Sequence, residues 1–243
     1  MAITPNAYAR WRESSLGALT EPIEREAVFA LTGCLAGLHV LDAGCGDGTY
    51  AIRAAQLGAR VTAIDYSRAM LDAARRRAEV AGVYVNWCGG RAEALPLQTA
   101  SFDLVIAVTV LCGVSDPAAA VREMARVVRP GGAVVIGELG RYNLWAFFRR
   151  VRGWLGSRFW RAARFWTVGE LHSLAESAGL QFCKASYAVY YPPSRILAKW
   201  LVPFDRPLST ITSTGAAFLC ILVGKPPVTG VASGDRLPAS TSS

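Results

Sequence analysis

The stretch VLDAGCGDGTYAIRAAQLGARVTAIDYS, residues 40–67, constrains the fold of this chain more than any other segment. It reads as a buried strand, a glycine-rich turn, a helix and a second strand that ends at Asp65. Parallel neighbouring strands need a crossover connection, and a helix commonly supplies it. The order of elements therefore predicts a βαβ unit of an open parallel sheet, whose ligands bind beyond the carboxyl ends of the strands.

Apolar runs bounded by turn residues recur after this unit, with stretches of helical periodicity between them. The expected strands cover residues 38–42, 60–65, 83–88, 102–108 and 132–138. The expected helices cover residues 48–57, 67–81 and 117–128. This alternation predicts an α/β fold, with a doubly wound, Rossmann-like sheet that is mostly parallel and carries helices on both faces.

Several helix boundaries have a physical signal. Ser67 can cap the helix that follows it, and Asp116 before Pro117 supplies an N-cap with proline at the first helical position. The Pro-Gly-Gly turn at residues 130–132 should stop the third helix before the fifth strand.

The C-terminal part of the chain follows a different pattern. A basic aromatic stretch covers residues 141–166, and Thr167 can open a short helix that ends near Ala178. Two β-rich runs, 181–191 and 215–224, are expected to pair as an antiparallel edge and to complete a seven-stranded sheet. The long excursion between these runs contains Pro192, Pro193, Pro203 and Pro207.

Length and composition fit one globular domain. The chain has 243 residues, of which 52% are hydrophobic and 18% are charged, enough to bury a substantial core. We expect the domain to cover residues 1–224, with N-terminal cap helices in 1–36 and a basic aromatic insertion or lid in 141–166. Residues 225–243 are rich in Pro, Gly and Ser and are expected to be a disordered tail.

The sequence carries no targeting or metal-binding pattern. Its N-terminal residues lack the apolar stretch of a signal peptide, and no apolar run reaches the roughly 18 residues that span a bilayer. A cytoplasmic protein is therefore expected.

The cysteines form no C-x-x-C pair, which favours buried free thiols over disulfides or a zinc site, and we expect no metal. They are Cys34, Cys45, Cys88, Cys112, Cys183 and Cys220.

The glycine turn is compatible with two cofactors. Residues 46–51, GDGTYA, satisfy the dinucleotide pattern with alanine in the last place, and Asp65 lies where an acid would bind the ribose. Asp42, however, immediately precedes the turn, where its carboxylate would repel a pyrophosphate. S-adenosylmethionine has no phosphate, and its α-ammonium suits a nearby acid while helix amides can bind its carboxylate. Charge therefore favours S-adenosylmethionine, with an NAD(P)-dependent oxidoreductase as an alternative.

The order of motifs also resembles a known family. The segments VLDAGCGDG, IDYSRAML, GGRAEALPLQTASFDLVIAVTVL and VREMARVVRPGG follow one another along the chain. They are similar to the successive motifs of class I S-adenosylmethionine-dependent methyltransferases, specifically the type 11 group that includes the ubiquinone/menaquinone-biosynthesis C-methyltransferases. The resemblance covers residues 8–224. It implies methyl transfer to a small, hydrophobic or aromatic acceptor, quinone-like or lipid-like acceptors included, with S-adenosylhomocysteine as the product.

The resemblance also implies roles for individual positions. Asp42 and the glycines of the turn would hold the methionine end of the cofactor, and Asp65 would hold the ribose. Tyr66 and Met70 would pack on the adenine, with the backbone amide of Ala92 at a ring nitrogen. The implied cofactor-binding set is Asp42, Gly44, Cys45, Gly46, Gly48, Asp65, Tyr66, Met70, Ala92, Glu93 and Ala107. The acceptor-binding candidates are Tyr8, Trp11, Cys112, Tyr142 and Trp145.

Two positions depart from the pattern of the family. Members usually place Asp where this chain has Arg91, which cannot accept a hydrogen bond from the adenine amino group, and Glu93 is the carboxylate that could substitute. The loop at residues 111–114 reads LCGV where the group often has LHHV, so no acid or base can be assigned from the family. Because of these two departures, a second hypothesis stays open: the protein binds the cofactor but is catalytically silent.

Catalysis needs few special residues here. Methyl transfer from a sulfonium is an in-line displacement with a neutral leaving group, so alignment in a dry site can supply most of the catalysis. A base is needed only where the acceptor holds its proton tightly at neutral pH. Glu138, at the carboxyl end of the fifth expected strand, is the better candidate, and Cys112 is a second one that could line the acceptor pocket. His39 and His172 are expected in core or surface roles.

The segment 141–166 concentrates the charge of the chain. Residues 141–164 carry seven arginines and no acid, while the whole chain has a net charge of +8. Asn143 can cap a helix in which apolar residues recur at helical spacing. These residues are Leu144, Phe147, Phe148, Val151 and Leu155. Three functions compete: a helix whose stripe packs on the core, a lid that also makes a peripheral contact with an anionic membrane, and nucleic-acid binding, which is disfavoured because no RNA-binding module is recognisable. The sequence does not determine the oligomeric state.

Overall fold

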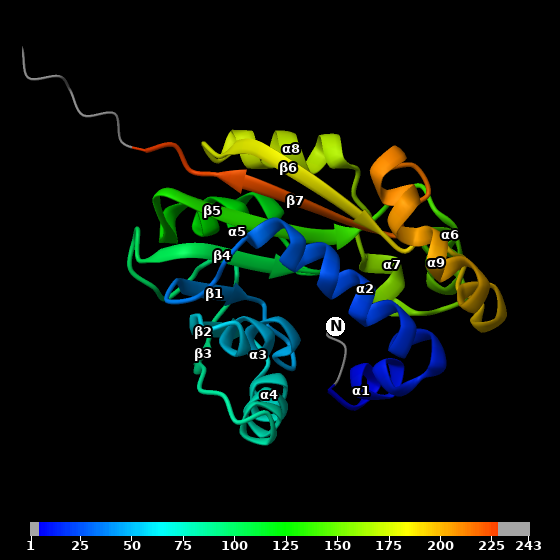
Figure 1. Cartoon of the computed structure of the whole chain (residues 1–243), viewed down its shortest axis with the longest axis horizontal. Coiled ribbons are helices and arrows are strands. Elements are labelled where there is room, and N and C mark those ends of the chain that lie inside the picture. The colour runs from blue at the N-terminus through cyan, green and yellow to red at the C-terminus, as the bar shows by residue number, and fades with distance from the viewer. Residues whose placement is uncertain (1–4, 228–243) are drawn as a thin grey trace, which may run out of the picture.

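The computed structural model describes residues 5–227, in which helices and strands alternate around one sheet (Figure 1). The strands are β1 (His39–Ala43), β2 (Arg60–Asp65), β3 (Asn86–Gly89), β4 (Phe102–Val108), β5 (Val128–Leu139), β6 (Gln181–Ala188) and β7 (Phe218–Gly224). The helices are α1 (Pro5–Glu13), α2 (Ser15–Thr32), α3 (Thr49–Gln56), α4 (Arg68–Val80), α5 (Pro117–Val127), α6 (Leu144–Trp154), α7 (Arg158–Ala162), α8 (Val168–Ser177) and α9 (Arg195–Ile211).

The seven strands form one sheet in the order β3-β2-β1-β4-β5-β7-β6. Strands β1 to β5 are mutually parallel, and β7 pairs antiparallel with both β5 and β6. The expected fold, a mostly parallel sheet with an antiparallel C-terminal strand, is confirmed, although β7 lies inside the sheet and β6 forms its edge. The chain order reverses between β1 and β4, and the crevice at such a switch point is where open α/β sheets bind ligands.

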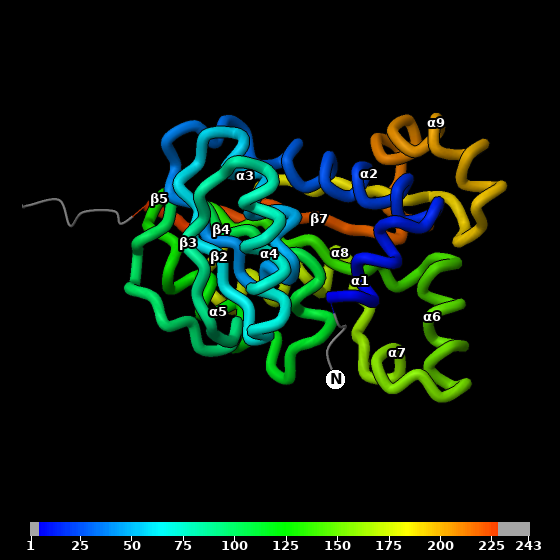
Figure 2. Tube along the Cα trace, turned by 90° about the horizontal axis from the view of Figure 1, so that it is seen from below, coloured from blue at the N-terminus to red at the C-terminus, as the bar shows by residue number. Residues whose placement is uncertain are grey.

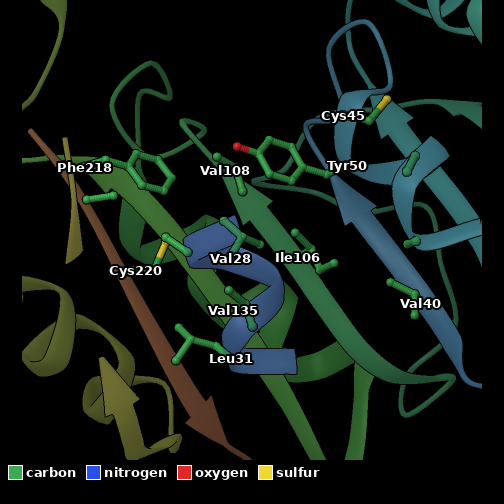
Figure 3. Close-up of a cluster of buried hydrophobic side chains, with 14 of the residues drawn as sticks. Val28, Leu31, Val40, Cys45, Tyr50, Ile106, Val108, Val135, Phe218 and Cys220 are labelled. Carbon is green, nitrogen blue, oxygen red and sulfur yellow. The ribbon is translucent and has the colours of Figure 1, made fainter. Parts of the chain in front are cut away.

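Helices cover both faces of the sheet. α2 and α3 pack on one face, and α5 and α8 pack on the other (Figures 1 and 2). On the first face, Val28 of α2 lies over Ile106 of β4 and Val135 of β5, all fully buried (Figure 3). On the second, Met124 of α5 and Leu171 of α8 belong to one buried cluster with inner residues of the sheet. Two apolar layers therefore hold the strand ends, and the loops beyond them, in fixed positions.

Side-chain caps begin the helices where the sequence predicts. The four N-caps predicted from the sequence each accept a hydrogen bond from the backbone amide three residues further on: Ser67, Asp116, Asn143 and Thr167. The end of α5 differs from the prediction, because the chain passes directly into β5 at Val128, which pairs with Phe102. The turn at 130–132 consequently lies within β5, where Gly131 donates a hydrogen bond to the carbonyl of Lys225 at 2.9 Å.

The excursion between β6 and β7 contains a helix that the sequence analysis did not predict. α9 continues through Pro203 and Pro207, although each proline lacks the N–H that would bond to the carbonyl one turn earlier. Prolines usually indicate a break in a helix, and here that signal was misleading. The carboxylate of Asp205, between the two prolines, accepts hydrogen bonds from the backbone amides of Val189 and Tyr190 and attaches the helix to the end of β6.

The helix expected after Asn143 forms as α6, but its apolar stripe does not pack on the core. Leu144 and Phe147 are each 54% exposed, and Leu155 is 82% exposed. Trp145 faces inward instead, because its indole N–H donates to the backbone carbonyl of Tyr191 at 2.7 Å. The alternative in which this apolar stripe packs on the core is therefore wrong, and the helix packs through its other side.

Residues 228–243 of the expected tail lie outside the described residues. The ammonium of Lys225 donates to the carbonyls of Ala125 and Val128 at 2.7 and 2.8 Å, at the end of α5. Within residues 5–227, no helix combines the length and the hydropathy needed to cross a membrane.

Candidate functional site

The glycine turn after β1 leaves backbone open to a ligand. Gly44, Gly46 and Gly48 have φ angles of +78°, +53° and +84°, which favour glycine. A Cβ at Gly44 would lie 2.6 Å from a methyl group of Val110, and one at Gly48 would lie 2.8 Å from the ring of Trp87. A Cβ at Gly46 would meet nothing within 4 Å. Gly46 therefore borders open space, while its two neighbours are glycines because the surrounding chain is close.

Asp42, the residue on β1 just before the turn, is buried and only partly satisfied. Its side chain is 2% exposed, and its Oδ2 has no hydrogen-bond partner. Burial raises the pKa of Asp42 to about 7 against an opposing hydrogen bond from the amide of Ala51, and the carboxylates of Asp65 and Asp47 raise it further. A buried carboxyl with a free oxygen is a suitable partner for a cation, which would lower that pKa again.

Asp65 ends β2 beside the same turn. One of its oxygens accepts the amide of Gly46 at 2.9 Å, and the other accepts the amide of Ser67 at 2.8 Å. Each carboxylate oxygen has two lone pairs, so both can still accept a hydroxyl group. The two backbone bonds hold the carboxylate at the turn, as a ribose-binding acid requires. Next to it, Tyr66 is 60% exposed and Met70 is buried in the first turn of α4.

The N-terminal helix is attached to the turn by an ion pair that the sequence analysis missed. Arg12 of α1 donates to Oδ2 of Asp47 at 2.5 Å, and Arg77 of α4 binds Oδ1 of the same carboxylate at 2.8 Å. Nη1 of Arg12 is buried and has no hydrogen-bond partner. Arg12 lies one helical turn after Tyr8, and its guanidinium carbon is 5.5 Å from the centroid of that ring.

Two unpaired buried atoms of opposite character therefore border the turn. Oδ2 of Asp42 is an acceptor, and Nη1 of Arg12 is a donor. An α-amino acid carries an ammonium and a carboxylate, which together would satisfy both atoms. The methionine end of S-adenosylmethionine fits this pair. A pyrophosphate would satisfy Arg12 and would be repelled by the Asp42 carboxylate.

The adenine side of the site contains the arginine that departs from the family pattern. Arg91 binds Oε1 of Glu93 at 3.1 Å, and its guanidinium carbon lies 6.0 Å from the ring centroid of Tyr66. The same oxygen of Glu93 accepts the hydroxyl and the amide of Ser115 at 3.0 and 3.3 Å. Ala92 lies buried between them. Glu93 thus compensates the charge of Arg91.

Glu138, near the end of β5, lies against Cys112 in the loop after β4, and Ala107 of β4 is fully buried. Glu138 is fully buried, with Oε1 accepting the amide of Leu111 at 2.6 Å and Oε2 unpaired. Burial raises the pKa of Glu138 to about 8. The thiol of Cys112 donates to the carbonyl of Thr109 at 3.2 Å, and burial followed by the charge of Glu138 raises the pKa of that thiol. Glu138 therefore fixes the loop after β4 and is protonated at neutral pH.

α6 and α7 cover this loop. Cys112 packs in one apolar cluster with Ala146 and Phe165, and its carbonyl accepts the amide of Arg164 at 3.1 Å. Isolation from water follows from this packing, and it is one requirement for displacement at a methyl group.

Arg149 of α6 lies off the exposed apolar stripe and turns toward the interior. Its guanidinium carbon lies 5.0 Å from the ring centroids of both Trp145 and Trp160. Burial lowers the pKa of Arg149, while Glu24 of α2 acts to raise it. Burial raises the pKa of Glu24 to about 7, with Arg149 opposing that shift. Sequence reasoning named neither residue as part of the site, because no local pattern connects positions so far apart.

The other acceptor candidates have different environments. Tyr8 and Trp11 lie on α1 with ring centroids 5.6 Å apart, and burial raises the pKa of the Tyr8 hydroxyl. Trp145 points inward, whereas Tyr142 is 69% exposed. Among residues 5–227, no group of three or more His, Cys, Asp or Glu side chains is placed to hold a metal ion.

Comparison with known proteins gives three kinds of match. Residues 41–136 match the family model described as a methyltransferase domain. A ubiquinone biosynthesis O-methyltransferase of Methylocella silvestris is 46% identical over 44% of this chain, and the match covers 42% of that relative's length. One from Aeromonas salmonicida is 32% identical over 76% of this chain and 84% of its own length. The crystal structure of a SAM-dependent methyltransferase from Thermotoga maritima, described as a possible histamine N-methyltransferase, is 26% identical, with a TM-score of 0.69 over 90% of this chain and 95% of that one.

Proposed function

The chain belongs to the S-adenosylmethionine-dependent methyltransferases, and we propose that it transfers a methyl group to a small, hydrophobic or aromatic acceptor. The observation that carries this proposal is the pair of unpaired buried atoms at the glycine turn, Oδ2 of Asp42 and Nη1 of Arg12. Together they match the two charges of an α-amino acid.

Each end of the cofactor would have its own residues. Asp42 would bind the ammonium, Arg12 the carboxylate, and Asp65 the ribose hydroxyls. Tyr66 and Met70 would flank the adenine. When bound, the cofactor supplies an electrophilic methyl group on a sulfonium.

The acceptor is proposed to be a phenol or hydroquinone that is methylated on oxygen. Support comes from the relatives named as ubiquinone biosynthesis O-methyltransferases and from the apolar cluster around Cys112. The inward-facing guanidinium of Arg149 would favour a phenolate, because a nearby cation lowers the pKa of an acid. The acceptor oxygen forms the new bond to carbon as the bond from carbon to sulfur breaks.

Glu138 stays the catalytic candidate in this proposal. Its Oε2 is unpaired, and with a pKa of about 8 the minor fraction of Glu138 that is ionised at neutral pH would be the proton acceptor. The phenolic proton would pass to this carboxylate and from there to water. Cys112 would line the acceptor pocket without reacting, because burial keeps its thiol protonated.

The test is formation of S-adenosylhomocysteine with a panel of catechols and short-chain hydroquinones. Turnover with one acceptor class is expected, reduced at least tenfold by Asp42→Asn and unchanged by Asp72→Asn, which alters an exposed carboxylate of α4. Cofactor binding without turnover on any acceptor would favour the catalytically silent alternative. Oxidation of NADH with no methyl transfer would favour the oxidoreductase.

A further inference from the structure

α9 is an amphipathic helix whose apolar side faces outward. Its inward positions follow helical spacing and carry shorter side chains than the outward ones: Ala198, Val202, Asp205 and Ser209. The outward stripe is Ile196, Trp200, Phe204, Leu208 and Ile211. Of these, Trp200 is 75% exposed and Ile211 is 78% exposed. A helix on a globular core normally buries such a stripe, so this face is available to something outside the domain.

Specific contacts fix the helix in this orientation. Asp205 is 5% exposed, and its oxygens accept the amides of Tyr190 at 2.7 Å and Val189 at 3.1 Å. The hydroxyl of Tyr190 donates to the carbonyl of Thr212, just after the helix. Turning the apolar stripe inward would break these bonds and leave the amide of buried Val189 without its acceptor, which is costly. The outward apolar face is therefore built into the fold.

α6, with Leu155 just after it, also exposes apolar side chains. Leu144, Phe147, Phe148, Trp154 and Leu155 are each between 48% and 82% exposed. Both views place α6 and α9 at one end of the molecule, the end to which the carboxyl ends of the parallel strands point (Figures 1 and 2). We name the outward residues of α9 and α6 together the apolar end surface.

Positive charge accompanies this surface. α9 carries Arg195, Lys199 and Arg206, and its only acid is the buried Asp205. A surface hollow of about 540 Å³ at the start of α9 is lined by Arg195, Lys199 and Trp200. Residues 141–164 carry seven arginines and no acid, although Arg149 faces inward and Arg141 pairs with Glu170 at 2.7 Å. Two cations and an indole around a hollow suit a phosphate headgroup, because Trp and basic residues favour the interface of an anionic bilayer.

We propose that the apolar end surface docks on an anionic lipid bilayer, with α9 lying in the interface. The contact expected for 141–166 thus becomes secondary to a helix outside that segment. A second copy of the chain would bring like charges together, and nucleic acid would not use a row of aliphatic side chains. The proposal stands independently of the acceptor, although docking would place the covered site next to molecules dissolved in the membrane.

Vesicle flotation of the full chain tests the proposal. The probes are vesicles of phosphatidylcholine alone and with about a third phosphatidylglycerol, at low and high salt. Binding to the anionic vesicles is expected, with weakening at high salt. Trp200→Glu with Phe204→Glu should reduce it at least tenfold, and so should Arg195→Gln with Lys199→Gln and Arg206→Gln. Val80→Glu with Tyr84→Glu is the matched control. Both residues are exposed, and Tyr84 lines a hollow with the first residues of β1, β2 and β4, away from the carboxyl ends of the strands.

Several results would overturn the proposal. Equal binding by the Trp200→Glu, Phe204→Glu variant would exclude α9, and equal binding to both vesicle types would exclude recognition of anionic lipid. Absence of flotation together with a dimer, detected by sedimentation velocity and lost in this variant, would assign the surface to self-association. Titration of S-adenosylmethionine into each variant separates this outcome from failure of the proposed function, since the cofactor residues are unchanged.

Discussion

The guanidinium of Arg12 binds the carboxylate of Asp47 across 35 positions of sequence, at 2.5 Å. This contact joins the first helix of the chain to the glycine turn. It also leaves Nη1 of Arg12 unpaired in a buried position. The N-terminal helix therefore contributes a charged donor to the proposed cofactor site.

Loss of that donor should weaken cofactor binding. A hydrogen bond between charged groups is worth about 1.5–3 kcal/mol, so Arg12→Gln should raise the Kd of S-adenosylmethionine and S-adenosylhomocysteine about 10- to 100-fold. Isothermal titration measures both. Arg10→Gln, an exposed change on the same helix, is the control and should leave both constants within twofold. Equal affinity in the Arg12 variant would remove it from the site.

Affinity for the cofactor should rise with pH below neutrality. Asp42 has a pKa of about 7, and only its carboxylate can pair with an ammonium. From pH 5.5 to pH 7, where an α-ammonium stays protonated, affinity should increase about tenfold as Asp42 ionises. Asp42→Asn should abolish this dependence and bind weakly throughout. A flat profile in the unaltered protein would show that Asp42 does not receive the ammonium.

Most of the proposed cofactor site around the glycine turn could be predicted from the sequence, because its residues are close together along the chain. Asp42, the glycines and Asp65 belong to one strand-turn-helix-strand unit, in which chain order determines spatial order. Arg12 could not be assigned in this way. Its partner is distant in sequence, and only the packing of α1 against the turn brings the two together.

The buried carboxyl of Glu138 should make the protein less stable at alkaline pH. Burial raises the pKa of Glu138 from about 4.5 to about 8, so the folded state holds a proton that the unfolded state releases. The resulting stability is complete below pH 4.5 and is lost as pH rises through 8, by at most about 1.4 kcal/mol per pH unit.

Thermal unfolding in buffers from pH 5 to pH 9 measures this effect. Above pH 7, where Asp42 and Glu24 are already ionising, the fall in Tm should flatten in Glu138→Gln. Glu79→Gln, at an exposed position, should retain the fall. If Tm depends on pH in the same way in Glu138→Gln as in the unaltered protein, another group causes the loss of stability at alkaline pH.

Substitution by alanine should destabilise the protein much more at Gly44 than at Gly37, a glycine of similar backbone conformation. Gly44 and Gly37 have φ angles of +78° and +79°, so each should lose about 1–2 kcal/mol to backbone strain. Only at Gly44 would the new Cβ approach Val110, to 2.6 Å. Val110 is buried and stiff at χ1, so Gly44→Ala should cost about 1–3 kcal/mol more than Gly37→Ala in denaturant unfolding. Equal losses would mean that Val110 moves aside.

The orientations of α6 and α9 were the least predictable part of the fold. The apolar stripe of α6 has the spacing of a packed helix, yet Trp145 and Arg149 hold its other side inward. α9 contains two prolines, and Asp205 keeps its large apolar residues outward. In both helices a few polar contacts determine which side is buried, and hydrophobic periodicity cannot reveal such contacts.

The choice of cofactor is the central claim, and one titration tests it most directly. S-adenosylmethionine, S-adenosylhomocysteine and NADH are each titrated calorimetrically into the purified protein and into Asp65→Ala. We predict micromolar binding of both sulfur compounds, loss of that binding in the variant, and no heat with NADH. Binding of NADH, or failure of both sulfur compounds to bind the unaltered protein, would contradict the assignment of the glycine turn to S-adenosylmethionine.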